Sequence, residues 1–323
     1  MPKYDVYGMC NSIVDILLKT DDSLIKKLGL QKGIMRLVDV SESQKILTEV
    51  KDKAKTIMPG GSGCNTMIGI ANLGGKAVFS NVVGNDDYGR IFEDKLTKLG
   101  VVSNLKKKEG MTGSSVILIT PDSERTMNTC LGVCRLFGKE DVNEKELINS
   151  KIFHTTGYLI DTAPEAGYHA LELAKKHSLK ISFDMSDPFL IKAKKEELRK
   201  ILENYADIVF LNEEEARLFT GKQPEEAIKE IQKLCRTVII KLGAEGSLIS
   251  HENKISRIPA FKVNAIDTTG AGDMYAAGFL FGITNGYSIE QSGKIASFAA
   301  SKVVEVIGAR IDYSLKAEIP KLF

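Results

Sequence analysis

The segment Asp267-Thr268-Thr269-Gly270-Ala271-Gly272-Asp273 runs directly into an apolar stretch, Met274-Tyr275-Ala276-Ala277-Gly278-Phe279-Leu280. A polar, glycine-rich loop therefore precedes an expected helix. The first backbone N–H groups of a helix have no partner within the helix, and the helix dipole is positive there. Glycines let that backbone approach a ligand closely. The segment predicts an anion-binding cradle, suited to a phosphoryl group on which negative charge develops.

Asp273 lies in the first turn of this expected helix. A carboxylate in the cradle would repel a bound phosphate, so its presence suggests a chemical role. It could take the proton of an attacking hydroxyl group. Alternatively, Asp273 only caps the helix and the glycines form a turn, and the loop alone leaves both interpretations open.

Two further segments place polar groups in apolar surroundings. The glycines of Gly60-Gly61-Ser62-Gly63-Cys64-Asn65 indicate either a plain loop or a close approach to a ligand, and Asn65 could bond a hydroxyl. Asp15 lies within an apolar run. A buried carboxylate needs hydrogen-bond donors. A vicinal diol would supply two, and a neighbouring Arg or Lys would serve equally well.

Around these segments, short apolar runs alternate with longer stretches of helical period. This alternation predicts an α/β fold with a doubly wound, mostly parallel central sheet flanked by helices. The expected strands are Tyr4–Met9, Val78–Val83, Ile152–Thr156, Ile181–Met185, Ile208–Leu211 and Val238–Leu242. The expected helices are Gly63–Leu73, Asp87–Leu99, Glu165–His177, Glu196–Asn204, Glu213–Phe219 and Glu225–Leu234.

Two stretches interrupt the alternation. Ser12–Lys19 with Ile34–Val40, and Ser114–Thr120 with Thr126–Leu131, are strand-like and have no helix between partners. The second pair is joined by a turn sequence beginning at Pro121. We expect a small antiparallel β lid, formed by about residues 12–40 and 105–131 and inserted in a single domain that spans residues 1–323.

Composition and charge exclude several classes of protein. The chain has 323 residues, 43% hydrophobic and 27% charged, as in ordinary soluble domains. Lys and Arg number 44 against 42 Asp and Glu, which disfavours nucleic-acid binding. The uncharged apolar run Met274–Ile289 is shorter than the ~20 apolar residues of a membrane span. With no signal-peptide pattern and five scattered cysteines, we expect a cytoplasmic protein with free thiols and no membrane partner.

Other common catalytic motifs are missing from the sequence. Gly74-Gly75-Lys76-Ala77 lacks the hydroxyl residue of a Walker-type phosphate loop. No Gly-x-Gly-x-x-Gly follows the first expected strand, which disfavours a dinucleotide oxidoreductase. The four histidines lie far apart and show no metal-ligand spacing.

Taken together, these segments resemble the ribokinase-like, or phosphofructokinase-B, family of carbohydrate and nucleoside kinases over nearly the whole chain. Two family signatures are present: Gly60–Asn65 continuing through Val83–Gly89, and Asp267–Asp273. Asn212-Glu213-Glu214-Glu215 resembles the family's Asn-x-x-Glu motif, and Lys241–Gly246 resembles the strand end that lies along ATP. The resemblance implies an ATP-dependent kinase that uses Mg²⁺.

The resemblance also implies roles for individual residues. Asp273 matches the catalytic base, and Arg125 resembles the lid arginine that reaches the transferred phosphate. The anion hole would be formed by Gly270, Ala271 and Gly272. The acceptor would be bound by Asn11, Asp15, Gly60, Gly61, Asn65, Met127 and Asn128. ATP would be bound by Asn212, Glu215, Lys241, Gly243, Gly246, Thr268 and Thr269, with Glu215 contacting Mg²⁺ through water.

A monovalent cation such as K⁺ lies in relatives beside the first acid of the loop, here Asp267. The apolar residues Val304–Ile307 leave this dependence open. The sequence also leaves open whether the chain is a monomer or a homodimer.

The acceptor is implied by finer resemblances. Tyr7–Ile16 and Arg125–Gly132 are close to the adenosine kinase form of these motifs, which implies transfer of the γ-phosphate to the 5′-hydroxyl of a nucleoside, adenosine first. Methionines such as Met35 and Met127 could clasp a purine or fill the core. The alternative is a sugar kinase for ribose, fructose or 2-keto-3-deoxygluconate.

Two further alternatives are weaker. A phosphosugar acceptor is disfavoured because no arginine cluster accompanies Asp15 in the sequence. A catalytically silent sugar- or nucleotide-binding regulator could share the same fold. The presence of Asp273, Asn212, Glu215 and Arg125 argues against this regulator.

Overall fold

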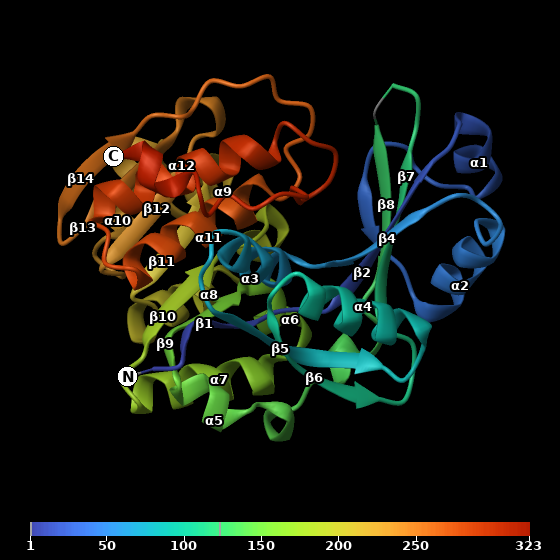
Figure 1. Ribbon diagram of the computed structural model, residues 1–323, viewed down its shortest axis with the longest axis horizontal. Helices are drawn as coiled ribbons and strands as arrows, with labels where there is room; N and C mark the ends of the chain where they lie inside the picture. Colours follow the sequence, from blue (N-terminus) through green and yellow to red (C-terminus); the bar gives the residue numbers. More distant parts are fainter. Residues whose placement is uncertain (1, 123) are drawn as a thin grey trace.

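Two sheets make up the architecture. The computed structural model of the chain describes residues 2–122 and 124–323, and a five-stranded sheet projects from a nine-stranded one (Figure 1). In spatial order the large sheet contains β14 (Lys254–Ile258), β13 (Ser247–His251), β12 (Thr237–Lys241), β11 (Ile208–Asn212), β10 (Lys180–Asp184), β9 (Ser150–Thr156), β1 (Tyr4–Met9), β5 (Ala77–Gly84) and β6 (Val102–Lys108). Strands β12 to β6 pair in parallel, and β13 and β14 add an antiparallel edge. The predicted mostly parallel α/β core is confirmed.

Helices bury both faces of the large sheet, which is why its strands read as nearly continuous apolar runs. Along β11, Ile208 and Phe210 pack into one core, whereas Val209 and Leu211 pack into the other. The first core includes α3 (Ser62–Asn72), α4 (Asp87–Lys98), α11 (Ala271–Thr284) and α12 (Ile289–Val303). The second includes α5 (Glu144–Ile148), α6 (Gly157–Thr162), α7 (Pro164–Lys176), α8 (Pro188–Asn204), α9 (Glu213–Thr220) and α10 (Pro224–Ile231). Short 3₁₀ turns are η1 (Gly132–Leu136), η2 (Lys139–Asp141), η3 (Gly243–Glu245) and η4 (Ile319–Leu322).

The smaller sheet contains the strands expected in the lid, but Ile13–Lys19 and Met35–Leu37 are not partners in it, and a helix lies between them in the chain. Its strands are β3 (Met35–Leu37), β8 (Arg125–Cys130), β7 (Gly113–Ile119), β2 (Ile13–Lys19) and β4 (Thr56–Gly60). The pairs β2–β4 and β7–β8 are antiparallel, whereas β2–β7 and β3–β8 are parallel. Helices α1 (Asp22–Lys27) and α2 (Val40–Glu49) cover its outer face, where Leu24, Ile25 and Ile46 pack with the buried side of β2.

The lid boundaries differ from the expected ranges of 12–40 and 105–131. Val102–Lys108 forms β6, which pairs with β5 at the edge of the large sheet. An edge strand can carry charged residues such as lysines. For this reason the lysine-rich end of Val102–Lys108 reads in the sequence as a solvated segment of the lid rather than as a strand of the large sheet. Thr56–Gly60 forms the lid edge strand β4, although it contains Pro59. Proline is tolerated there because one side of an edge strand makes no ladder hydrogen bonds.

The site is set by the edge of the large sheet that faces the lid. Parallel strands place their carboxyl ends at one edge, and open α/β sheets bind ligands there. Strands β1, β9, β10, β11 and β12 all end at this edge. Because β2 follows β1 after three residues, the lid is attached at this edge, and it stands to the right of the large sheet in Figure 1.

The five cysteines are buried and free, as the sequence predicts. In residues 2–122 and 124–323, no helix has the length and apolar character needed to cross a bilayer.

Candidate active site

The N-terminus of helix α11 lies in the site, and no side chain caps it. The helix begins after Gly270, whose φ of +77° is the left-handed conformation that favours glycine. A Cβ on Gly270 would lie 2.6 Å from Cβ of Ala309, and one on Gly272 would lie 3.0 Å from Nζ of Lys241. Gly270 is therefore required by its φ and by close packing, whereas a side chain at position 272 would only require Lys241 to shift. Backbone N–H groups of the first turn stay available to an anion.

Asp273 does not cap α11. Its carboxylate instead accepts hydrogen bonds from two residues of α3: Ser62 Oγ reaches Oδ1 at 2.7 Å, and Asn65 Nδ2 reaches Oδ2 at 3.0 Å. Burial raises the pKa of Asp273 to about 6, opposed by these two hydrogen bonds. The structure thus excludes the capping alternative, and the role of Asp273 as a base stays a prediction.

The start of α3 packs against the loop after β1. Gly61 has φ of +88°, and a Cβ there would lie 2.2 Å from the backbone oxygen of Asn11. A Cβ on Gly60 would collide with the carboxylate of Asp15, at 2.3 Å from Oδ2. Gly61 and Asn65 line the cleft, whereas Gly60 gives the room for the Asp15 side chain.

Asn11 and Asp15 face the same cleft of about 630 Å³ as Asp273. Asn11 Nδ2 donates to Thr162 Oγ1 at 3.0 Å, and its Oδ1 is buried without a partner in the described part of the chain. Burial raises the pKa of Asp15 to about 6, opposed by the charges of Arg310 and Arg125. Both residues are placed where an acceptor hydroxyl group could bind.

The lid contributes an apolar end to this cleft. Strand β8 alternates, so Met127 lines the cleft while Asn128 is buried on the other face and accepts a 2.9 Å hydrogen bond from Arg36 Nε. The structure therefore does not bring Asn128 to the site. Met35 and Leu37 of β3 and Phe189 of α8 also line this end and are 42%, 51% and 40% exposed. Exposed apolar side chains gathered in one cleft indicate a ligand with an apolar part.

The other end of the cleft holds the expected ATP-binding residues. Asn212 and Glu215 form a reciprocal capping box at the start of α9. Lys241 Nζ lies 3.1 Å from Oδ2 of Asp184. Gly243 also lines the cleft. Gly246 does not, because it turns the chain between β12 and β13, where a Cβ would lie 2.0 Å from the backbone oxygen of Ile258.

Arg125 joins the lid to the loop before α11. It forms an ion pair with Asp267, and its Nη1 donates to Thr269 Oγ1 at 2.8 Å. Asp267 Oδ1 accepts from the backbone and hydroxyl of Thr269 at 3.0 and 2.7 Å, and its Oδ2 accepts from the backbone N–H of Gly308 at 2.6 Å. Burial opposes the charge of Asp267, yet these donors and Arg125 lower its pKa. Thr268 and Thr269 also line the cleft.

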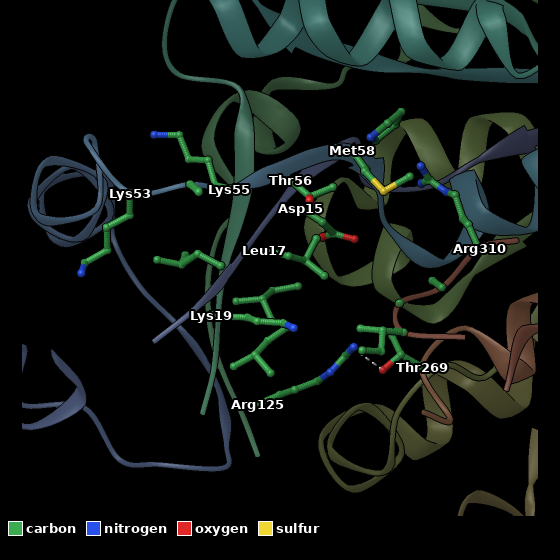
Figure 2. A pocket seen from close by; sticks show the side chains of 18 residues that line it. Asp15, Leu17, Lys19, Lys53, Lys55, Thr56, Met58, Arg125, Thr269 and Arg310 are labelled. Carbon is green, nitrogen blue, oxygen red and sulfur yellow. Dashed lines mark hydrogen bonds between the residues drawn. The ribbon is translucent and has the colours of Figure 1, made fainter. Parts of the chain in front are cut away.

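A second cavity of about 720 Å³ adjoins the cleft at Asp15 (Figure 2). Its lining includes five cationic side chains: Lys19, Lys53, Lys55, Arg125 and Arg310. Figure 2 shows Lys53 and Lys55 turned away from Asp15, so the arginines carry the positive charge near it. Two arginines near Asp15 remove the sequence-based argument against an anionic acceptor.

Residues 32–316 match the pfkB family of carbohydrate kinases. The chain belongs to this family. The solved adenosine kinase from Sinorhizobium meliloti is 34% identical, with a TM-score of 0.90 over 99% of this chain and all of that one. A probable sugar kinase from Rhizobium etli CFN 42 is 33% identical, with a TM-score of 0.90 over the whole of both chains. The 5-dehydro-2-deoxygluconokinase of Bacillus subtilis is 30% identical over 76% of this chain and 80% of its own.

Membership makes the chain a kinase that uses ATP, with a carbohydrate or nucleoside as acceptor. Asp273, the mouth of α11, Asn212 and Lys241 then lie in the cleft of a kinase, and Arg125 lines the adjoining cavity. The individual roles of these residues in this pfkB-family kinase stay predictions.

The side chains at Glu215 and Asp267 show whether Mg²⁺ or K⁺ could bind there. No cluster of three His, Cys, Asp or Glu that could hold an ion occurs in residues 2–122 and 124–323. Burial raises the pKa of Glu215 to about 7. Its oxygens each accept one hydrogen bond from Asn212 at 2.8 Å and keep lone pairs for a water molecule. Glu215 therefore fits a water-mediated Mg²⁺ contact, with the phosphates as direct ligands. At Asp267 a guanidinium and N–H donors surround the carboxylate, an environment that does not favour K⁺.

Arg310 is the site residue that sequence reasoning missed. It follows Ile307-Gly308-Ala309, and its Nη2 donates to Asn65 Oδ1 at 3.0 Å. No local pattern distinguishes it from a surface arginine. Its position comes from the packing of Ala309 against Gly270, a contact between segments far apart in sequence.

Proposed function

We propose that this pfkB-family kinase transfers the γ-phosphate of ATP to the 5′-hydroxyl of a nucleoside, adenosine first. Away from the expected ATP-binding residues, the lining of the cleft has an apolar and a polar end, and this observation carries the proposal. Met35, Leu37 and Met127 supply an apolar end, whereas Asn11, Asp15 and Asn65 supply a polar one. A nucleoside joins a flat, largely apolar base to a polyhydroxyl sugar, so it matches both ends. A simple sugar has no group for the apolar end.

The chemistry follows from the groups around Asp273. The carboxylate takes the proton of the acceptor hydroxyl, the oxygen forms a bond to the γ-phosphorus, and the bond to the bridging oxygen of ADP breaks. Backbone N–H groups at the start of α11 stabilise the charge on the transferring phosphoryl group. Arg125 would leave Asp267 to reach the same group as the lid closes over the cleft. Mg²⁺, when bound, neutralises the ATP oxygens, and Glu215 would hold it through water.

A second candidate has its own observation. The cationic side chains beside Asp15 favour an acceptor with an anionic group, such as a sugar acid. The Bacillus subtilis relative is a 5-dehydro-2-deoxygluconokinase. A sugar kinase of this kind would use the same base and the same ATP end of the cleft.

An acceptor panel tests the proposal. The purified protein with ATP and Mg²⁺ is given adenosine, inosine, cytidine, ribose, fructose or 2-keto-3-deoxygluconate, and ADP release is measured. We expect adenosine to give the highest kcat/KM. Faster turnover of a sugar or sugar acid would reject the nucleoside assignment, and absence of transfer to every acceptor would favour a silent regulator.

A further inference from the structure

Arg310 has donor groups that the protein does not use. Only Nη2 is bonded, to Asn65, while Nε and Nη1 are buried and have no partner in the described part of the chain. Buried N–H groups without a partner are rare in folded proteins because desolvating them is costly. The guanidinium is also close enough to Asp15 and Asp273 for their charges to act on it. Its free donors therefore lie among the residues expected to bind the acceptor.

The chemistry of Asp15 complements these donors. Its carboxylate accepts hydrogen bonds only, and burial and charge, rather than hydrogen bonds, account for its shifted pKa. Arg310 donates only. A hydroxyl group does both, so each hydroxyl of a diol could donate to Asp15 while its oxygen accepts from Arg310.

We propose that Arg310 is an acceptor-binding residue whose Nε and Nη1 donate to the oxygens of a vicinal diol. The proposal rests on the proposed function, because the diol is the 2′,3′ pair of a ribonucleoside. Nη2 has a second effect. By donating to Asn65 Oδ1, it directs Nδ2 of the same amide toward Asp273. Arg310 would therefore bind the sugar and also orient Asn65, which donates a hydrogen bond to the proposed catalytic base.

Deoxy substrates test this directly. Initial rates at saturating ATP are measured for adenosine, 2′-deoxyadenosine and 3′-deoxyadenosine with the wild type, Arg310→Lys and Arg310→Gln. We expect Arg310→Gln to lose roughly 10- to 100-fold in kcat/KM for adenosine, mainly through KM, because hydrogen bonds from a charged donor are lost. The loss for at least one deoxy analogue should be far smaller, so the preference for the ribonucleoside collapses.

A purely structural role predicts a different pattern. All three nucleosides would then lose activity by the same factor, and that result would overturn the proposal. Arg257→Gln is the matched control, because Arg257 lies on the surface and pairs with Glu245 and Glu225. This variant should leave the ratios of kcat/KM between adenosine and the two deoxy analogues unchanged.

Two further measurements keep the outcome decisive. If Arg310→Gln does not fold, Arg310→Lys retains the charge without the planar fork of donors, and the rise in its Tm on adding adenosine should be smaller than in the wild type. An equal rise would count against the contact. If the acceptor panel selects a sugar, the nucleoside proposal fails on its own, and the same comparison with that sugar and its deoxy analogues decides the role of Arg310.

Discussion

Asn65, in the first turn of α3, donates a 3.0 Å hydrogen bond from Nδ2 to Oδ2 of Asp273 in the first turn of α11. Ser62 donates to the other oxygen. The two glycine-rich segments of the sequence therefore meet through one carboxylate. Neither donor removes the proton-accepting capacity of Asp273, since each oxygen keeps a lone pair.

Replacing this carboxylate should abolish most of the turnover. Asp273→Asn keeps the shape of the side chain but cannot accept the hydroxyl proton, so we expect kcat to fall by ~10² or more. The circular dichroism spectrum should stay that of the wild type. Asp94→Asn, an exposed position on α4, is the control and should retain full activity. Near-wild-type turnover of Asp273→Asn would remove the assignment of the base.

Activity should depend on pH through the same group. Burial raises the pKa of Asp273 to about 6, so the ionised form that accepts a proton predominates only above that pH. We expect kcat to be constant near pH 8 and to fall about tenfold per unit well below pH 6. Burial also raises the pKa of Asp15 to about 6. Because protonated Asp15 accepts hydrogen bonds less well, KM for the acceptor should rise as the pH falls through 6. A kcat profile that stays flat down to pH 5 would contradict a base with this pKa.

Much of the fold could be predicted from periodicity, because the decisive strands are buried on both faces. Ile208–Leu211 reads as an apolar run since alternate residues enter two cores. Edge strands lack this signal. Two edge strands show the difference. The sequence pattern predicts Val102–Lys108 partly as lid instead of as an edge of the large sheet, and it does not predict the strand Thr56–Gly60 at all.

The site was predictable where a backbone requirement shows in the sequence. Gly270 and Gly61 adopt positive φ and pack tightly, so only glycine fits. Side-chain direction is harder to predict, because neighbouring residues on a strand point to opposite faces. Met127 lines the cleft, whereas Asn128 is buried on the other face and accepts a hydrogen bond from Arg36. Arg310 depends on a tertiary contact that no local pattern encodes.

Substitutions of Met127 and Asn128, which are adjacent on β8, should affect different properties: the first substrate binding, the second stability. Met127→Ser removes apolar contact from the cleft, so KM for adenosine should rise by about tenfold while KM for ATP and the Tm change little. Asn128→Ala removes the acceptor of Arg36 Nε, so unfolding free energy should fall by about 1 kcal/mol with KM unchanged. Urea unfolding and initial rates on both variants decide this. A larger KM effect at Asn128 than at Met127 would reverse the assignment of faces.

Arg125 and Asp267 form an ion pair between two parts of the chain. It holds the lid against the loop before α11, and Thr269 accepts a further hydrogen bond from the same guanidinium. Arg125→Gln removes the charge, so the amides of β7 and β8 should exchange faster with solvent in the absence of substrates. The same change should lower kcat by about tenfold or more, because the transferring phosphoryl group loses a cationic partner.

The two effects can be separated with a second variant. Thr269→Val keeps the ion pair but removes the hydroxyl that Arg125 contacts, so it should loosen the lid only slightly. Because Thr269 is expected to bind ATP, its effect on activity should appear in KM for ATP, and most of the kcat should remain. Arg257→Gln is the control for charge, since Arg257 lies on β14 at the far edge of the large sheet and pairs with Glu245 and Glu225. Hydrogen exchange read by mass spectrometry follows the lid, and initial rates follow the chemistry. Unchanged exchange in Arg125→Gln would show that the ion pair does not hold the lid, and unchanged kcat would show that Arg125 does not reach the phosphate.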